Sequence, residues 1–177
     1  MYLFSLLRYQ DADAWESKSM DIVGKKKRSL MMAGIKNCNT KPEIQIRCML
    51  HQAGFRYRLH SNRLPGRPDI WLAKYKAVIE VNGCFWHGHG CHMFKLPSTR
   101  TAFWEAKIAI NKERDHRHLA ELQQLGIRRL TIWECALRGR KRHDMVRLMS
   151  VISWWLSSAD YHAEIAGGQE LVLIPVE

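Results

Sequence analysis

The sequence lacks any hydrophobic run long enough to cross a membrane. No stretch approaches the roughly 20 consecutive apolar residues that a spanning helix needs. The short apolar run at the N-terminus has no basic residues before it and no small-residue cleavage site after it, so it does not fit a signal peptide. We therefore expect a soluble, cytoplasmic protein.

Acidic residues are scarce relative to basic ones. The chain of 177 residues has 28 Lys and Arg against 17 Asp and Glu, which gives a net charge of +11, and 46% of its residues are hydrophobic. This hydrophobic content excludes a disordered chain. A basic excess of this size most often serves a polyanion, and the absence of a long amphipathic basic helix favours nucleic acid over a membrane surface. A basic surface without such a partner is the alternative.

Regular hydrophobic periodicity is confined to a few segments, and these predict an α/β protein with a mixed sheet flanked by helices. Residues 1–24 show no periodicity and are expected to form a poorly structured extension, and residues 25–177 are expected to form one domain that begins with a mobile basic arm over 25–40. The expected helices cover 41–53, 101–125 and 145–156, and the expected strands cover 69–72, 77–81, 127–133 and 170–176.

Cysteine is infrequent and odd in number, at five residues, which argues against a disulfide framework. Cys84, His89 and Cys91 instead form a C-x4-H-x-C cluster, and two thiolates with an imidazole suit tetrahedral zinc if a fourth ligand is supplied. Cys135 follows a predicted strand and is the candidate for this fourth ligand. Buried, unligated cysteines are the alternative.

Two carboxylates lie on the predicted strand pair. Asp69 begins one strand and Glu80 lies on the next, so a hairpin brings them together as oxygen ligands for Mg²⁺. The pattern resembles the P-D…(D/E)-x-K signature of restriction-type nucleases, with Asn82 in place of the lysine. Glu43 fits a capping box with Thr40 and points inward on its helix. His87, if it is no zinc ligand, is a candidate general acid or base.

Aromatic residues are interleaved with polar ones around the cysteine cluster. Phe85 and Trp86 lie in a glycine-flanked loop, and exposing them is costly unless they stack on bases or pack under a lid. Trp104, Lys107 and Asn111 share one face of the long predicted helix, where they could contact DNA or belong to the core. Core packing is favoured for Phe103.

Several blocks of residues, in the same order, resemble the very-short-patch-repair (Vsr) mismatch endonucleases over about residues 24–158. The blocks are LPGRPD at 64–69, GCFWH at 83–87, CHMFK at 91–95, TRTAFW at 99–104 and WECALRGR at 133–140. The resemblance implies a restriction-endonuclease-like fold with a structural zinc. It implies an enzyme that nicks one DNA strand 5′ of the thymine in a T:G mismatch, the product of 5-methylcytosine deamination.

The resemblance also implies roles for individual residues. Asp69 would bind Mg²⁺ with the carbonyl of Val81, and Glu80 would compensate for Asn82, which stands where the family can carry a second histidine. His87 would be the catalytic histidine, supported by Glu43. The implied zinc ligands are Cys84, His89, Cys91 and Cys135, and the implied DNA contacts are Met32, Ile35, Phe85, Trp86, Trp104, Lys107 and Asn111.

The implied partners are double-stranded DNA with a T:G mismatch and the mismatch-repair protein MutL, for a monomer associated with the bacterial nucleoid. Two other functions remain open from the residues. One is a restriction or homing enzyme that cuts intact duplex, and the other is a non-catalytic zinc module that binds DNA.

Overall fold

The computed structural model describes residues 23–34, 36, 38–158, 162–168, 170 and 174–175. The expected N-terminal extension lies almost entirely outside the described residues. The helices are α1 (Lys25–Ala33), α2 (Lys41–Gln52), α3 (Thr101–Gln124), α4 (Glu134–Leu137) and α5 (Met145–Ser157), with a short 3-10 turn over Ala73–Tyr75. The strands are β1 (Arg58–Leu59), β2 (Ile70–Leu72), β3 (Ala77–Asn82), β4 (Arg128–Trp133), β5 (His162–Ile165) and β6 (Ile174–Pro175).

The strands form one mixed sheet in the order β1-β2-β3-β4-β5-β6. β2 and β3 form the predicted antiparallel hairpin, and β3, β4 and β5 run parallel to one another. The long helix α3 makes the crossover from β3 to β4. Asn82 at the end of β3 pairs with Trp133 at the end of β4, so the segments that follow both strands emerge side by side.

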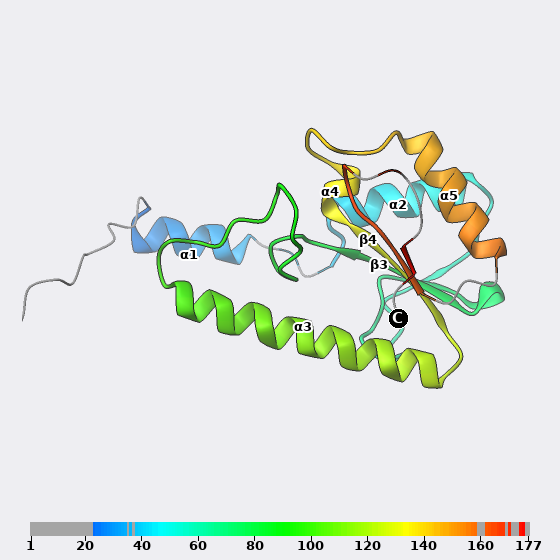
Figure 1. Ribbon diagram of the computed structural model, residues 1–177, viewed down its shortest axis with the longest axis horizontal. Helices are drawn as coiled ribbons and strands as arrows, with labels where there is room; N and C mark the ends of the chain where they lie inside the picture. The colour runs from blue at the N-terminus through cyan, green and yellow to red at the C-terminus, as the bar shows by residue number, and fades with distance from the viewer. Residues whose placement is uncertain are drawn as a thin grey trace, which may run out of the picture.

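Helices cover both faces of the sheet (Figure 1). Apolar side chains of α2 and α5 pack on one face, where Ile46, Leu50, Ile152 and Trp155 are fully buried against the central strands. Leu122 of α3 packs with Val78 and other apolar residues of a second, smaller cluster. These observations confirm the expected α/β class.

The expected long elements are present, and the differences concern short or isolated ones. The arm is helical over Lys25–Ala33, where a mobile segment was expected, because Lys, Arg, Leu, Met and Ala are all good helix formers. Figure 1 shows this helix projecting beyond the sheet. Sequence periodicity did not reveal β1, α4 or β5, which have two to four residues each. Among the described residues, no helix is long and apolar enough to span a membrane.

Candidate active site and metal centre

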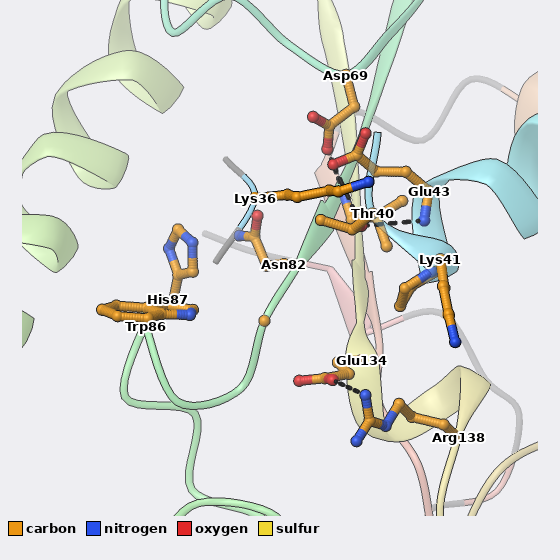
Figure 2. Close-up of a pocket in the computed structure, with 13 residues that line it drawn as sticks. Lys36, Thr40, Lys41, Glu43, Asp69, Asn82, Trp86, His87, Glu134 and Arg138 are labelled. Carbon is orange, nitrogen blue, oxygen red and sulfur yellow. Dashed lines mark hydrogen bonds and ion pairs between the residues drawn. The ribbon is translucent and has the colours of Figure 1, made fainter. Parts of the chain in front are cut away.

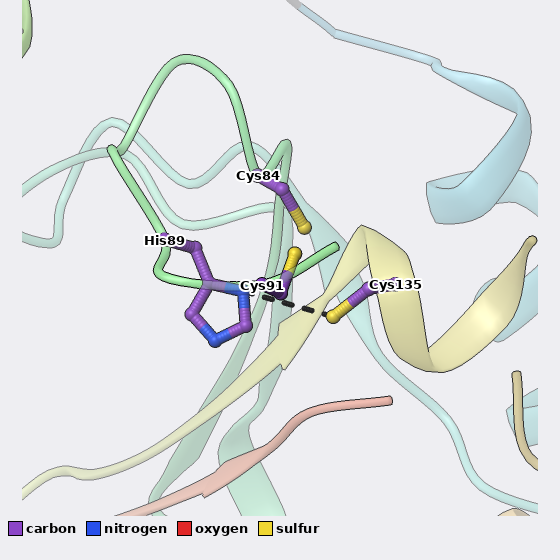
Figure 3. Close-up of side chains that lie close together, drawn as sticks. All are labelled: Cys84, His89, Cys91 and Cys135. Carbon is purple, nitrogen blue, oxygen red and sulfur yellow. Dashed lines mark hydrogen bonds between the residues drawn. The ribbon is translucent and has the colours of Figure 1, made fainter. Parts of the chain in front are cut away.

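The four predicted zinc ligands come together at the ends of β3 and β4. Cys84 and Cys135 follow the paired residues Asn82 and Trp133, and the intervening loop returns His89 and Cys91 to the same point (Figure 3). One ligand atom from each residue lies within 4.8 Å of the other three. The cluster predicted from spacing is therefore present in the fold.

The geometry and chemistry of the cluster fit zinc. His89 Nδ1 lies 3.6 Å from Cys135 Sγ, and a tetrahedron with ordinary Zn–S and Zn–N bonds places such a pair about 3.6 Å apart. The His89 ring stacks on Trp133 at 4.2 Å, and Trp133 Nε1 donates to Glu164 Oε2 at 2.8 Å. Four protein ligands leave no open position for water, so this site suits a structural metal.

Backbone N–H groups donate hydrogen bonds to two of the sulfur atoms, and such bonds favour the thiolate form that binds a cation. The N–H of Gly167 donates to Cys135 Sγ at 3.2 Å, and the N–H of Met93 donates to Cys91 Sγ at 3.4 Å. Burial raises the pKa of Cys84 and Cys135. Burial acts the same way on Cys91, but N–H and thiol donors outweigh it and lower its pKa. A bound metal ion would stabilise the thiolate forms of Cys84 and Cys135, which burial alone disfavours.

A separate cavity of about 600 Å³ holds the predicted catalytic residues. Asp69, Glu43 and His87 line it, together with Val81 and Asn82. Figure 2 shows the carboxyl groups of Asp69 and Glu43 close together on one side and His87 with Trp86 on the other. The fold thus brings together residues from α2, from the β2–β3 hairpin and from the loop that carries Cys84, His89 and Cys91, which we call the metal loop.

Asp69 is held by the neighbouring strand of its hairpin. The N–H of Val81 donates to Asp69 Oδ2 at 2.8 Å. Burial raises the pKa of Asp69 to about 7, and the charges of Glu43 and Glu80 act in the same direction, against the Val81 N–H. A bound divalent cation would favour the ionised form of this carboxyl group, and the hard oxygen donors of Asp69 and Val81 suit Mg²⁺.

This raised pKa predicts how stability depends on pH. Because the folded protein holds the Asp69 proton up to about pH 7, whereas the unfolded chain releases it near 3.8, stability falls between these values and stays low above them. Asp69→Asn removes this loss, so the variant should be more stable than the wild type at pH 8, by at most about 4 kcal/mol. Thermal unfolding without Mg²⁺ at pH 5 and pH 8 measures the difference. An identical pH dependence in both proteins would contradict the buried, protonated state.

His87 has a partner that the sequence did not reveal. Its Nδ1 forms a very short hydrogen bond with Asp115 Oδ2, from the middle of α3. Burial would raise the pKa of Asp115, but the hydrogen bond and charge of His87 outweigh it and lower that pKa. With Nδ1 occupied, Nε2 is the ring nitrogen left for proton transfer. Asp115 lies within a run of charged residues, and only the tertiary fold singles it out.

Glu43 lines the cavity but is not the residue that contacts His87. It caps α2 with Thr40, as predicted, since the N–H of Glu43 donates to Thr40 Oγ1 at 3.4 Å. Its carboxylate accepts from the N–H of Asn39 and from Arg47, both at 2.7 Å. The support expected from Glu43 for His87 is supplied by Asp115, and a catalytic role of Glu43 beside Asp69 stays a prediction.

Glu80 is directed elsewhere. Its carboxylate lies 3.5 Å from Arg129 Nε on β4, and it does not line the cavity, whereas its neighbours Val81 and Asn82 do. Arg129 pairs with Val78 across the two strands, which makes it the diagonal neighbour of Glu80 on the same face of the sheet. Glu80 therefore lies outside the cavity but close enough for its charge to raise the pKa of Asp69, and its role as a Mg²⁺ ligand stays a prediction.

The aromatic residues of the metal loop form a preassembled cluster. The ring of Phe85 lies 5.1 Å from Trp86 and 5.3 Å from Trp104, and all three are only partly buried. The core packing expected of Phe103 is wrong, because 47% of this residue is exposed and its ring packs against Trp104 and Arg100. The sequence could not show which side of α3 faces the sheet at its first turn.

The remaining predicted DNA contacts are distributed unevenly. Lys107 is exposed on α3, whereas Asn111 is buried and donates from Nδ2 to the carbonyl of Trp86 at 2.8 Å. Asn111 therefore holds the aromatic loop in place. Met32 belongs to α1, and Ile35 lies outside the described residues. The DNA contacts themselves stay predictions.

Known proteins are similar in sequence to this chain over most of its length. The family described as "DNA mismatch endonuclease Vsr" matches residues 20–93. The DNA mismatch endonuclease Vsr of Escherichia coli (strain K12) is 41% identical over 145 residues, which cover 82% of this chain and 93% of that protein. The type II nicking enzyme V.NmeAIP of Neisseria meningitidis serogroup A is 43% identical over 68% of this chain and 86% of that protein.

A solved structure, the catalytic domain of the homing endonuclease I-Bth0305I, aligns with a TM-score of 0.44 and 25% identity over 67% of this chain and 97% of that chain. The family match over residues 20–93 spans the arm, the β2–β3 hairpin and the metal loop, whereas Trp104, Lys107, Asn111 and Cys135 lie beyond it. The chain belongs to the DNA mismatch endonuclease Vsr family.

Proposed function

We propose that this protein is a Mg²⁺-dependent endonuclease that nicks one strand of duplex DNA 5′ of the thymine in a T:G mismatch. Its relatives are named as a DNA mismatch endonuclease and as nicking enzymes. The single observation that carries the proposal is the cavity in which Asp69, Glu43 and His87 converge. The product would be a nick at a deaminated 5-methylcytosine, which starts very short patch repair.

Asp69 and the main chain of Val81 would hold the catalytic cation. Mg²⁺, when bound, polarises the scissile phosphate and neutralises charge that develops on it. Asp69 is already fixed for this task by the Val81 N–H at 2.8 Å. Two carboxyl groups close together disfavour each other's charge, so Asp69 and Glu43 together favour a cation over an empty site.

His87 would move the proton. Because Asp115 holds Nδ1, Nε2 can accept a proton from an attacking water, and the Asp115 carboxylate stabilises the imidazolium that results. The backbone around His87 is fixed by the ligands Cys84 and His89 on either side of it. Zinc would thereby position the catalytic histidine without taking part in the reaction.

The proposal is tested with four matched duplexes that contain T:G, T:A, C:G or C:A at one position. Strand-specific nicking of T:G in Mg²⁺ supports it, and cleavage of T:A at a similar rate would identify an enzyme that cuts intact duplex. Binding without cleavage of any duplex would identify a non-catalytic zinc module. The predicted association with MutL and the predicted monomeric state are separate from this test.

The aromatic cluster predicts how the mismatch is distinguished. Insertion of Trp86 between base steps costs unstacking energy, and a T:G pair is easier to distort than a correct pair. Because stacking on one base is worth about 1–3 kcal/mol, Trp86→Ala should lower the nicking rate on T:G about tenfold or more and reduce the preference over T:A. Trp154→Ala is the matched control, since Trp154 is 59% exposed on α5. If both variants keep the full preference, Trp86 is no wedge.

The basic arm predicts a salt-dependent contribution to affinity. Lys25 to Arg28 open α1, and Lys26 and Lys27 are exposed. Replacing all four with alanine should reduce the slope of log K against log salt concentration by up to about four units, because each phosphate contact releases counterions. The T:G preference should change little. Fluorescence anisotropy at several salt concentrations measures the slope, and an unchanged slope would mean that the arm contacts no phosphate.

A further inference from the structure

Arg47 is a buried cation beside the candidate active site that the proposed reaction does not use. It lies on α2, one turn after Glu43, and only 7% of the residue is exposed. It is not among the residues that line the cavity. Burying a guanidinium is costly unless its donors are paired, so its partners indicate what the protein gains from this placement.

Three side chains pair with the guanidinium of Arg47. Nη1 donates to Asn39 Oδ1 at 2.6 Å, and Nη2 donates to Glu43 Oε2 at 2.7 Å. Nη2 also lies 2.9 Å from His60 Nε2. Because an arginine can only donate, His60 Nε2 accepts, and the His60 proton is on Nδ1. Burial, and then the charge of Arg47, lower the pKa of His60, which agrees with a neutral ring.

The partners of Arg47 belong to different segments that meet at the cavity. Asn39 ends the segment between α1 and α2, and His60 follows β1 and donates its N–H to the carbonyl of Asp69 at 3.4 Å. Asn39 and His60 have φ values of 55° and 47°. Asn and His are among the residues other than glycine that adopt such values most often, and hydrogen bonds to their side chains favour these conformations. Arg47 bonds to both side chains.

Arg47 also fixes how Glu43 is presented. Glu43 Oε2 accepts from Arg47 and from the N–H of Asn39, whereas Oε1 has, among the described residues, one hydrogen bond of 3.3 Å, from the Thr40 hydroxyl. Each carboxylate oxygen has two acceptor positions, so Oε1 retains free capacity. Figure 2 shows the Glu43 carboxyl group beside Asp69. The guanidinium holds one oxygen and leaves the other for the cavity.

We propose that Arg47 is a positioning residue of the active site. It fixes the Glu43 carboxylate beside Asp69 and, through Asn39 and His60, anchors the segments that carry the arm and Asp69. The use of this alignment in catalysis rests on the proposed nuclease function, but the alignment itself does not. One buried side chain thus links the base of the arm to the catalytic carboxylates.

Kinetics on the T:G duplex test the role with two substitutions of Arg47 and one control. Arg47→Met keeps the volume but removes every donor, and it should lower kcat about 100-fold while KM changes less than about threefold. Arg47→Lys keeps one donor toward Glu43 and should recover about tenfold. Tyr57→Phe is the control, because the Tyr57 hydroxyl donates to the Arg47 carbonyl at 2.9 Å and does not contact the guanidinium. It should lower Tm and leave kcat near the wild-type value.

The double variant separates positioning through Glu43 from a general loss of structure. In a Glu43→Gln background, Arg47→Lys should add little to the loss of kcat, because both changes weaken the same interaction between Arg47 and Glu43. The inference is overturned if the two losses multiply, or if Arg47→Met lowers kcat no more than Tyr57→Phe.

A measurement independent of cleavage keeps this inference separate from the proposed function. Nitrogen-15 NMR should show the Nδ1–H tautomer of His60, and amide exchange at Asn39 should be slow, in the wild type and in Tyr57→Phe but not in Arg47→Met. If the wild type shows these properties and nicks no T:G duplex, the nuclease proposal fails and the positioning by Arg47 stands. If Asn39 exchanges equally fast in the wild type and Arg47→Met, Arg47 does not anchor this segment and the inference is overturned.

Discussion

Replacing Asp69 with asparagine should abolish strand cleavage and leave DNA binding nearly unchanged. Asparagine has the same shape and can still accept the hydrogen bond from the Val81 N–H, which is 2.8 Å long in the wild type. It lacks the negative charge that the proposed Mg²⁺ ligand needs. The loss of transition-state stabilisation should lower the nicking rate on the order of a thousand-fold.

Single-turnover nicking of the T:G duplex, with a parallel binding titration, measures this effect. Glu113→Gln is the control, because it makes the same acid-to-amide change on an exposed position of α3. It should keep the wild-type rate. Nicking by Asp69→Asn within tenfold of the wild type would remove Asp69 from the active site, and with it the proposed position of the cation.

Loss of zinc should unfold the metal loop and inactivate the protein. A structural zinc site can contribute on the order of 10 kcal/mol to folding, and each kcal/mol corresponds to about 2–4 °C in Tm for a protein of this size. Cys135→Ser should therefore lower Tm by about 10 °C or more. Activity should fall with it, because His87 lies between the candidate ligands Cys84 and His89.

Metal analysis and thermal unfolding measure this prediction together. The wild type should contain one zinc per chain, and Cys135→Ser should release it to a chromogenic chelator much faster. Cys48→Ser is the control, since Cys48 is exposed on α2 and outside the cluster. A protein purified without chelator that contains no zinc, or a Cys135→Ser variant that retains it equally well, would refute the structural site.

Sequence patterns predicted the parts of the site that depend on short spacing. The trio of candidate zinc ligands lies within eight residues, from Cys84 to Cys91, and the hairpin that brings Asp69 to Val81 follows from two short strands. Cys135 could be added because its predicted strand could lie beside β3. Periodicity alone identified the buried stripe of α5, in which Trp155 and Ile152 are fully buried.

Tertiary contacts determined the rest. Asp115 was indistinguishable from the other charged residues of α3 until the fold brought it to His87. Arg47 looks like an ordinary surface arginine in the sequence, because nothing in a helical pattern marks a buried cation. The strand position of Glu80 predicts a place near the cation, and only the fold shows that its carboxylate also pairs with Arg129, which lies far along the chain.

The parallel pairing of β3 with β4 also determines the order in which the molecule can be assembled. Cys84, His89 and Cys91 are synthesised within one loop and can meet early, but Cys135 reaches them only after α3 has formed and β4 has docked beside β3. Contacts between segments so distant in the chain form slowly, because the loop between them must close first. A metal ion captured early would be held by three ligands and open to exchange, and the docking of β4 would trap it. The rate at which the bound ion exchanges should therefore fall when β4 docks beside β3, so this rate reports when the sheet is completed.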